Sequence, residues 1–225
     1  MTKACSNRNF VVDRPLLWDC EHPNLYRADT EVYYQGRLSD TYRTTFGIRT
    51  IEVVPEKGFL LNGKKLVFHG TCNHHDLGPL GTAVNMQAIR YRLKMLKDMG
   101  CNAYRTSHNM PSPELVQACN EMGMLLMVET FDEWKAKKMA NGYNKYYDEW
   151  VERDLVNVVR HYRNDPAVVM WCIGNEVPNQ WNEGDCKIAK RLQDICHRED
   201  PTRPVTQGMD APDAVVNNNF AAVMD

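Results

Sequence analysis

The chain has 225 residues, of which 43% are hydrophobic and 25% are charged, as in an ordinary soluble globular protein. Its net charge of -2 gives no electrostatic reason to expect nucleic acid or an anionic membrane surface as a partner. No apolar run approaches the roughly 20 residues that cross a bilayer, and residues 1–9 lack the apolar core of a secretory signal.

Strand signals dominate residues 1–54. Val32 to Tyr34 and Thr44 to Val53 are rich in β-branched and aromatic residues, and turn residues separate the two runs. We expect this segment to be the last strands of a β-sandwich, because it has too few strands to close two sheets. Next, Asn62-Gly63 between two apolar runs predicts a tight hairpin, since both turn positions need positive φ.

From residue 55 onward, strand-like runs alternate with amphipathic helices. Apolar residues at three- and four-residue spacing predict helices, as between Met86 and Met99, and Ser112-Pro113 supplies an N-cap and a first helical residue. The alternation implies an α/β fold with parallel strands and right-handed crossovers, and a further unit begins at Val215. Strands are expected at residues 66–72, 102–107, 124–129, 167–173 and 203–207.

Eight cysteines are many for this length, yet they form no Cys-x-x-Cys pair and no ligand spacing with histidine. Cys72, Cys101 and Cys172 fall in or beside strand-like runs, where a free thiol behaves as a small buried hydrophobic group. We therefore expect core thiols, no metal and no cofactor. Free thiols favour a reducing compartment, but the N-terminus is expected to be truncated, so both cytoplasm and periplasm remain open.

Polar clusters follow four of the expected strands, at residues 73–76, 105–109, 129–134 and 175–176. The carboxyl ends of parallel strands meet at one rim, where the sites of such folds gather. Chance solvation is a poor explanation for four clusters on the same rim. The pattern therefore predicts an active site there.

The cluster at Asn175-Glu176 ends a buried, apolar strand. A carboxyl group in such a crowded strand mouth has a raised pKa, which is the property that a general acid needs near neutral pH. The alternative is a helix N-cap, since Asn and Glu are common at strand-to-helix turns.

Five stretches carry a resemblance to a known family. They are Leu17-Trp18 with Pro23 to Tyr26, Phe46 to Arg49, Leu61 to Lys64, Asn102 to His108, and Trp171 to Glu176. In this order they resemble the family 2 glycoside hydrolases, the group of β-galactosidases, β-glucuronidases and β-mannosidases. The resemblance implies that residues 1–54 are the C-terminal strands of an immunoglobulin-like β-sandwich domain. Residues 55–225 would then be the N-terminal part of a TIM-barrel catalytic domain, an incomplete (β/α)₈ barrel of about five to six strands.

The same resemblance implies roles for individual residues. Glu176 would be the general acid/base, and Asn175 would bind the 2-hydroxyl of the sugar. Arg105 and His108 match positions that line the sugar subsite, and Asn109 follows them as a further candidate ligand. Residues 131–134 are similar to the corresponding segment of many bacterial β-galactosidases.

Further rim residues are candidates for binding substrate. Glu129 is expected to tune the acid through its charge or to bind sugar, and Asp76 to accept from a sugar hydroxyl. Only one of His74 and His75 can face the pocket, and we count His74 among the sugar ligands. The remaining candidate, Trp134, is either a stacking platform for a sugar or a core residue, and Lys135 to Lys138 are expected to be a solvated face.

Retaining glycosidases need a second carboxyl group about 5 to 5.5 Å from the acid. The resemblance puts this nucleophile on barrel strand 7, and no glutamate follows Glu199, so the nucleophile is expected to be missing from this chain. An open half-barrel should associate with another copy or with the missing part of the chain. We expect a fragment of a glycosidase that cleaves terminal β-linked sugars, with a β-galactosidase favoured. Alternatives are a non-catalytic carbohydrate-binding or scaffold fragment and a β-glucuronidase parent.

Overall fold

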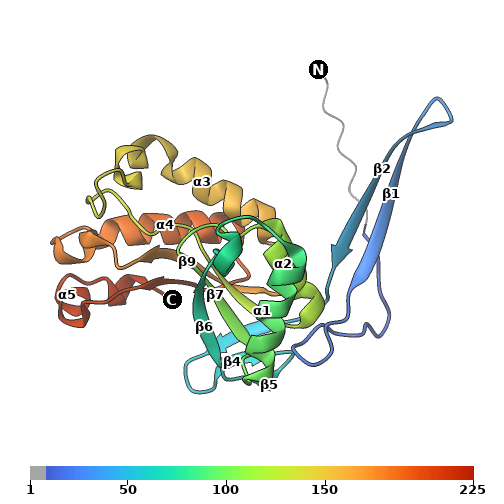
Figure 1. The fold of residues 1–225 in the computed structure, drawn as a ribbon, viewed down its shortest axis with the longest axis horizontal. Coiled ribbons are helices and arrows are strands. Elements are labelled where there is room, and N and C mark those ends of the chain that lie inside the picture. The colour runs from blue at the N-terminus through green and yellow to red at the C-terminus, as the bar shows by residue number, and fades with distance from the viewer. Residues whose placement is uncertain (1–8) are drawn as a thin grey trace.

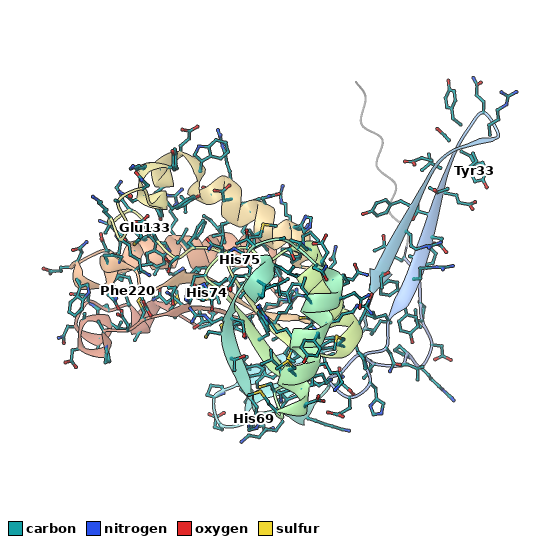
Figure 2. The ribbon with its side chains drawn as sticks, in the orientation of Figure 1. Tyr33, His69, His74, His75, Glu133 and Phe220 are labelled. Carbon is teal, nitrogen blue, oxygen red and sulfur yellow. The ribbon has the colours of Figure 1, made fainter. Side chains whose placement is uncertain are left out.

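The structure, a computed structural model, describes residues 9–225. Its first element is a long antiparallel hairpin in which β1 (Tyr26–Tyr34) pairs with β2 (Arg37–Phe46). The hairpin projects away from the other elements, with Tyr33 towards its tip (Figure 1, Figure 2). Its side chains are exposed along most of both strands. The part of the chain that the structure describes therefore leaves this hairpin uncovered.

A small antiparallel sheet follows, in the order β3 (Ile51–Val54), β4 (Gly58–Leu61) and β5 (Lys64–Lys65). The predicted turn at Asn62-Gly63 is confirmed, with φ of 52° and 74°. Because β3 pairs with β4 along its whole length, the boundary predicted after residue 54 passes through this sheet. We propose instead that the second domain begins at Ile51.

The strand expected from Thr44 to Val53 is two strands, interrupted at residues 47–50. Gly47 lies so close to Pro166 that an added Cβ would meet its ring at 2.7 Å. Arg49 donates from Nε to the carbonyl of Pro166 at 2.8 Å and from Nη2 to that of Val168 at 2.5 Å. The chain breaks its strand here because these residues dock on the start of a barrel strand.

The main sheet contains five parallel strands in the order β10-β9-β8-β7-β6. They are β6 (Gly70–His74), β7 (Ala103–Ser107), β8 (Leu125–Glu129), β9 (Val168–Asn175) and β10 (Val205–Gly208). This confirms the predicted α/β fold and an incomplete barrel.

The first of these strands begins at Gly70, four residues later than predicted. The Asn102 side chain binds the backbone just before β6, where it accepts from His69 N and donates to Val67 O, both at 2.9 Å. Side-chain hydrogen bonds thus replace strand pairing over this stretch.

Helices connect the strands as the apolar spacing predicts. They are α1 (Met86–Asp98), α2 (Pro113–Met122), α3 (Tyr147–Tyr162), α4 (Cys186–Glu199) and the short α5 (Pro212–Asn217), with 3₁₀ turns at Gly78–Leu80, Tyr143–Lys145, Pro178–Trp181 and Ala221–Val223. Ser112 caps α2 as predicted, its hydroxyl accepting from Leu115 N at 3.3 Å. Asn85 caps α1 in the same way through Ala88 N at 3.0 Å. The further unit expected near Val215 is α5.

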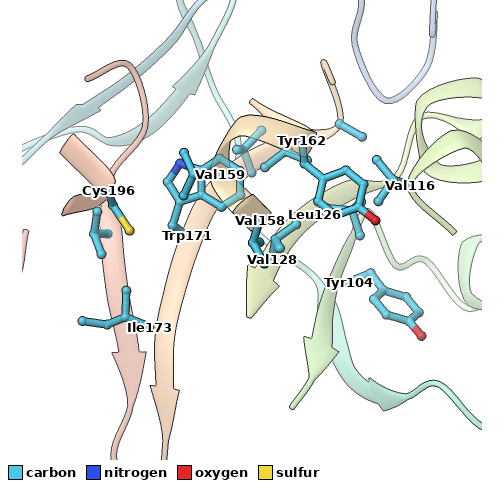
Figure 3. Packing of buried hydrophobic residues seen from close by; sticks show 14 of the residues in the cluster. Tyr104, Val116, Leu126, Val128, Val158, Val159, Tyr162, Trp171, Ile173 and Cys196 are labelled. Carbon is cyan, nitrogen blue, oxygen red and sulfur yellow. The ribbon is translucent and has the colours of Figure 1, made fainter. Parts of the chain in front are cut away.

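The two faces of the main sheet differ in burial. One face packs against the helices, where Leu126, Val128 and Trp171 lie beside Val159 and Tyr162 in the core (Figure 3). On the other face, the strand register aligns four side chains in a row across the sheet. This row borders a hollow of about 250 Å³. This row consists of Cys72, Arg105, Met127 and Met170.

The inner row corrects one prediction about cysteines. Cys72 is exposed on this face, whereas Cys172 is buried and Cys101 is partly buried. The seven cysteines in the described part of the chain are all free thiols. Within residues 9–225, no helix combines the length and the apolar character needed to cross a membrane.

The segment before the hairpin is fastened to the barrel by Trp18, which is fully buried. Its indole Nε1 donates to Asn120 O at 2.8 Å, and its own carbonyl accepts from Asn62 Nδ2 at 3.0 Å. The neighbouring Cys20 packs against Gly123 at the end of α2, where φ is 70°. Residues 18–20 and the base of the barrel are therefore one packed unit.

We predict that Gly123→Ala destabilises the protein more than Gly58→Ala. Both glycines have positive φ, so each alanine costs about 1–2 kcal/mol in backbone strain. At Gly123 the added Cβ would also lie 2.4 Å from Cys20 O, whereas at Gly58 nothing lies within 4 Å. Urea unfolding should show an additional loss of about 1–3 kcal/mol for Gly123→Ala. Equal losses would mean that residue 20 does not pack tightly here.

Candidate active site

Arg105 on β7 joins three neighbouring strand ends. Its Nε lies 2.8 Å from Glu129 Oε2 on β8, and its Nη2 donates to Asn175 Oδ1 on β9 at 3.0 Å. In the first contact the guanidinium and the carboxyl group lie within ion-pair distance but lack the alignment of a hydrogen bond. The thiols of Cys72 and Cys172 lie 3.5 and 3.8 Å from its Nη1 and Nη2. The strand register therefore brings predicted residues from three clusters together.

Glu129 is the buried carboxyl group of the rim, with no exposed side-chain surface. Its Oε1 lies 3.1 Å from His108 Nδ1, and its backbone N–H donates to Thr106 Oγ1 at 2.8 Å. Burial raises the pKa of Glu129 to about 8, although the positive charge of Arg105 opposes this. Near neutral pH Glu129 is therefore mostly protonated, and it lacks the negative charge that we expected to act on Glu176.

His108 shares this environment. Its ring is partly buried, and burial together with the nearby Arg105 charge lowers its pKa. A neutral ring with Nδ1 protonated can donate to Glu129, which leaves Nε2 as an acceptor. The ring of His74 stands edge-on to it, with 5.1 Å between the ring centroids.

Asp132, in the loop after β8, links the rim to a lysine that we had expected to be solvated. Its Oδ1 accepts from Asn175 Nδ2 at 3.0 Å and from Lys138 Nζ at 2.7 Å. Partial burial would raise the pKa of Asp132, but the hydrogen bonds from Lys138 and Asn175 outweigh burial and lower it. Asn175 therefore has both ends of its amide fixed, between Arg105 and Asp132.

Glu176 follows β9 in the left-handed region, with φ of 46°. Its backbone N–H donates to Gly208 O on β10 at 2.7 Å, so the turn is held by the neighbouring strand. The side chain is 51% exposed, and its Oε2 lies 3.9 Å from Lys138 Nζ. We predicted that this carboxyl group is crowded, but it is Glu129, and not Glu176, that has a fully buried side chain. The turn leads into a 3₁₀ segment, and the Glu176 carboxylate caps no helix that the structure describes.

The two adjacent histidines have different neighbours. Figure 2 shows His74 and His75 at the end of β6, and His74 contacts His108 whereas His75 lines a different cavity beside α1. Asp76 is exposed, and its backbone carbonyl accepts from Arg92. Asn109 is also exposed and borders a cleft of about 430 Å³. Asp76 and Asn109 stay candidate sugar ligands at the edge of the rim.

Trp134 is not a stacking platform. Its side chain is fully buried, and Nε1 donates to Ile173 O at 2.7 Å. The ring stacks on Phe220 and lies so close to Gly174 that an added Cβ would meet it at 2.9 Å. The core alternative is correct for this residue.

Sequence reasoning missed the roles of Lys138 and Glu133. Lys138 was grouped with its lysine neighbours, although its side chain is only 21% exposed. Glu133, labelled in Figure 2, accepts from three backbone N–H groups of its own loop, those of Lys138, Met139 and Asn144. The sequence does place two carboxyl groups, Asp132 and Glu133, a few residues before Lys138. Only the conformation of the loop reveals that Lys138, among the neighbouring lysines, contacts Asp132 and Asn175.

No group of three or more His, Cys, Asp or Glu side chains that could hold a metal ion occurs among residues 9–225. The rim contains three carboxyl groups, an amide, a guanidinium, an ammonium and two imidazoles close together. Such a set can bind hydroxyl groups and transfer a proton.

Comparisons with known proteins agree with this geometry. Residues 51–224 match the family model described as the TIM barrel domain of glycosyl hydrolases family 2, and residues 2–49 match a second model described as glycosyl hydrolases family 2. The first of these models covers more than half of the chain.

Two named relatives illustrate the range of activities. The chain is 40% identical over 238 residues to beta-galactosidase BoGH2A of Bacteroides ovatus, covering 92% of this chain and 28% of that protein. It is 38% identical over 203 residues to a putative beta-glucuronidase of Formosa agariphila, covering 90% of this chain and 19% of that protein. The chain thus spans well under a third of either relative.

Solved structures give the same result. A glycosyl hydrolase family 2 member from Bacteroides cellulosilyticus superimposes with a TM-score of 0.88 at 37% identity, over 94% of this chain and 27% of that one. The beta-glucuronidase of Parabacteroides merdae gives a TM-score of 0.74 at 30% identity, over 87% of this chain and 24% of that one.

We predict that the Glu129→Gln substitution removes a pH dependence of stability. The folded protein holds a proton on Glu129 up to about pH 8, whereas an unfolded glutamate releases it near 4.5. Protonation therefore favours the folded state, and the Glu129 contribution to the free energy of unfolding is lost between these pH values. Urea unfolding at pH 5 and pH 8 should show that the wild type loses its advantage over Glu129→Gln at the higher pH. The exposed Glu183→Gln is the matched control, and parallel pH profiles for all three proteins would contradict the burial argument.

Proposed function

The chain belongs to glycosyl hydrolase family 2, and we propose that it forms part of a retaining β-glycosidase in which Glu176 is the general acid/base. The observation that carries this proposal is the position of Glu176 at the carboxyl end of β9, directly after Asn175, whose side chain accepts a hydrogen bond from Arg105. Its carboxylate is half exposed, so a glycosidic oxygen can reach it.

In the first half of the proposed reaction, the Glu176 carboxyl donates its proton to the glycosidic oxygen as the bond to the sugar breaks. In the second half the same group, now a carboxylate, takes a proton from the attacking water. The second carboxyl group, which attacks the sugar carbon, would come from elsewhere in the longer protein.

Asn175 is suited to hold a sugar hydroxyl beside this acid. The Arg105 guanidinium donates to Oδ1 and Asp132 accepts from Nδ2, so the orientation of the amide is defined. Oδ1 retains a second lone pair and Nδ2 a second hydrogen for substrate. We propose that Asn175 binds the 2-hydroxyl, and that Arg105, His108 and His74 form the wall of the same subsite.

We propose β-galactosides as the substrates, with β-glucuronides as the second candidate. The relative named beta-galactosidase supports the first choice through 40% identity over almost the whole chain. The relatives named beta-glucuronidase support the second. The rim described here contains groups that bind hydroxyls, which both sugars present.

We predict that Glu176→Gln in the full-length protein slows hydrolysis of an alkyl β-glycoside by about 10² to 10⁴-fold. The loss should be smaller for an aryl glycoside with an acidic leaving group, because that group departs with less help from a proton. Glu183→Gln, which changes an exposed carboxyl in a nearby loop, is the matched control and should retain activity. An unchanged rate in Glu176→Gln would remove Glu176 from this role.

We also predict that the full-length protein turns over p-nitrophenyl β-galactoside faster than the corresponding β-glucuronide. Rates with both substrates, measured at equal concentration, decide between the two sugars. If neither sugar is hydrolysed while isothermal titration still detects galactose binding, the protein is a carbohydrate-binding module. Such a result would overturn the assignment of an enzyme.

A further inference from the structure

A cleft of about 430 Å³ lies beside the rim, and we call it the α3 cleft. Asn109 borders it from the loop after β7, Asp132 and Tyr143 border it from the segment between β8 and α3, and Asp154 and Asn157 border it from α3 itself. Sites for small molecules in proteins have volumes of roughly 300–1,000 Å³. The α3 cleft is therefore large enough to hold a small ligand.

The α3 cleft adjoins the rim through Asp132. This side chain lines the cleft and is 37% exposed, while its Oδ1 accepts from Asn175 Nδ2 at 3.0 Å and from Lys138 Nζ at 2.7 Å. Asn109, which we predicted as a ligand at the rim, borders the same cleft. A ligand that reaches Asp132 from the cleft would thus contact a carboxylate that is hydrogen-bonded to Asn175, the proposed partner of the sugar hydroxyl.

The cleft contains an aromatic ring that two contacts hold in place. Tyr143 packs on Phe131, with 5.1 Å between the ring centroids and 28° between the ring planes. The Tyr143 hydroxyl donates to Asp154 Oδ2 at 2.6 Å. Phe131 is buried in the core, so the aromatic pair is anchored there. Tyr143 can therefore offer apolar surface to the C–H groups of a sugar ring at little entropic cost.

The polar groups of the cleft suit hydroxyl groups. Asp154 and Asn157 stand three residues apart on α3, which puts them on one face of the helix. Asn157 and Asn109 are exposed, so their amides are open to a ligand. An amide both donates and accepts hydrogen bonds, and a carboxylate accepts them. This combination matches a sugar, whose hydroxyl groups do both.

The charge of the cleft selects among polar ligands. The charged residues that line it within the described part of the chain are all acidic, namely Asp132, Glu133 and Asp154. A uronic acid, a sulfated sugar or a phosphate would place its negative charge beside these carboxyl groups, which is unfavourable. A neutral sugar avoids this repulsion.

The wall that follows β8 is preformed. Glu133, labelled in Figure 2, is 4% exposed and accepts from the backbone N–H of Lys138, from Met139 N at 3.0 Å and from Asn144 N at 3.1 Å. An added Cβ on Gly142 would lie 1.8 Å from Glu133 Oε2, so the segment closes on this carboxylate only with glycine there. The cleft therefore needs little rearrangement to accept a ligand.

We propose that the α3 cleft is a second sugar-binding subsite, which holds a neutral sugar unit on the leaving-group side of the bond that is cleaved. The proposal rests on the proposed function, because that function places the terminal sugar at Asn175 and the bond at Glu176. The substrates are then β-linked oligosaccharides or glycans whose second sugar unit carries no charge.

The test compares a disaccharide with a methyl glycoside in the full-length protein. Both carry the terminal sugar that the p-nitrophenyl substrates identify, and the disaccharide has glucose as its leaving group. Asn157→Ala should lower the ratio of kcat/KM for the disaccharide to kcat/KM for the methyl glycoside by about 2- to 10-fold, the effect of one lost hydrogen bond. Asn217→Ala makes the same change at an exposed position of α5 outside the cleft, and this matched control should leave the ratio unchanged. If the ratio also stays unchanged in Asn157→Ala, the subsite is wrong.

A second measurement concerns charge. Replacing the leaving glucose by glucuronic acid should lower kcat/KM several-fold, because the added carboxylate meets Asp132 and Asp154. Asp154→Asn should reduce this penalty, since it removes one of the two charges while the side chain can still accept from the Tyr143 hydroxyl. Equal turnover of the neutral and the acidic disaccharide by the wild type would contradict the preference for a neutral unit.

The two proposals fail in different ways. If Glu176→Gln is fully active while the ratio falls in Asn157→Ala, the proposed acid is wrong and the subsite stands. If Glu176→Gln is inactive while the ratio in Asn157→Ala is that of the wild type, only the subsite is wrong. If no glycoside is hydrolysed, calorimetric titration with lactose and with galactose supplies the same comparison. The wild type should then bind lactose more tightly and Asn157→Ala should lose this difference, whereas equal affinities in the wild type would exclude the subsite.

Discussion

The partly buried charge of Arg105, whose side chain is 19% exposed, organises the rim. A guanidinium at this depth is costly unless acceptors surround it, and Glu129 and Asn175 provide them from the two neighbouring strands. Arg105 thereby links the ends of β7, β8 and β9 through side-chain contacts, in addition to the backbone hydrogen bonds between these strands. The orientation of the Asn175 amide follows from it, and so does the geometry of the residue after Asn175.

The two rim glutamates have different environments although each stands at a strand end. Glu129 ends β8 inside the sheet edge, where Arg105 and His108 cover it, and its proton is held to about pH 8. Glu176 lies one residue beyond β9, where the left-handed backbone turns the side chain towards solvent. The two carboxyl groups thus differ in burial, and the backbone conformation at Glu176 creates this difference.

Sequence reasoning succeeded where a local pattern decides the structure. Helical spacing located α1 to α4, Asn62-Gly63 located a turn, and parallel strands placed four polar clusters on one rim. It failed where distant residues decide. The break at residues 47–50 depends on contacts of Gly47 and Arg49 with residues more than 100 positions away, and the late start of β6 depends on the Asn102 side chain.

The same distinction applies inside the site. The pattern identified which residues stand at the rim, but burial and partner assignment came from packing. The Trp134 side chain lies in the core, where its indole N–H donates to Ile173 O. The Lys138 side chain points to the rim because Glu133 accepts from the backbone of the loop and fixes its conformation. A run of lysines in the sequence gives no indication of which one will meet a carbonyl group.

The backbone at Glu176 also places stability and chemistry in opposition. Glycine adopts φ of 46° without the strain that any side chain with a Cβ atom brings, and asparagine adopts it more readily than glutamate. A population of variants sorted only for resistance to heat would therefore drift away from glutamate at this position. Glutamate at this position lowers the stability of the fold locally through backbone strain. Laboratory evolution of this protein therefore has to screen for turnover at every round.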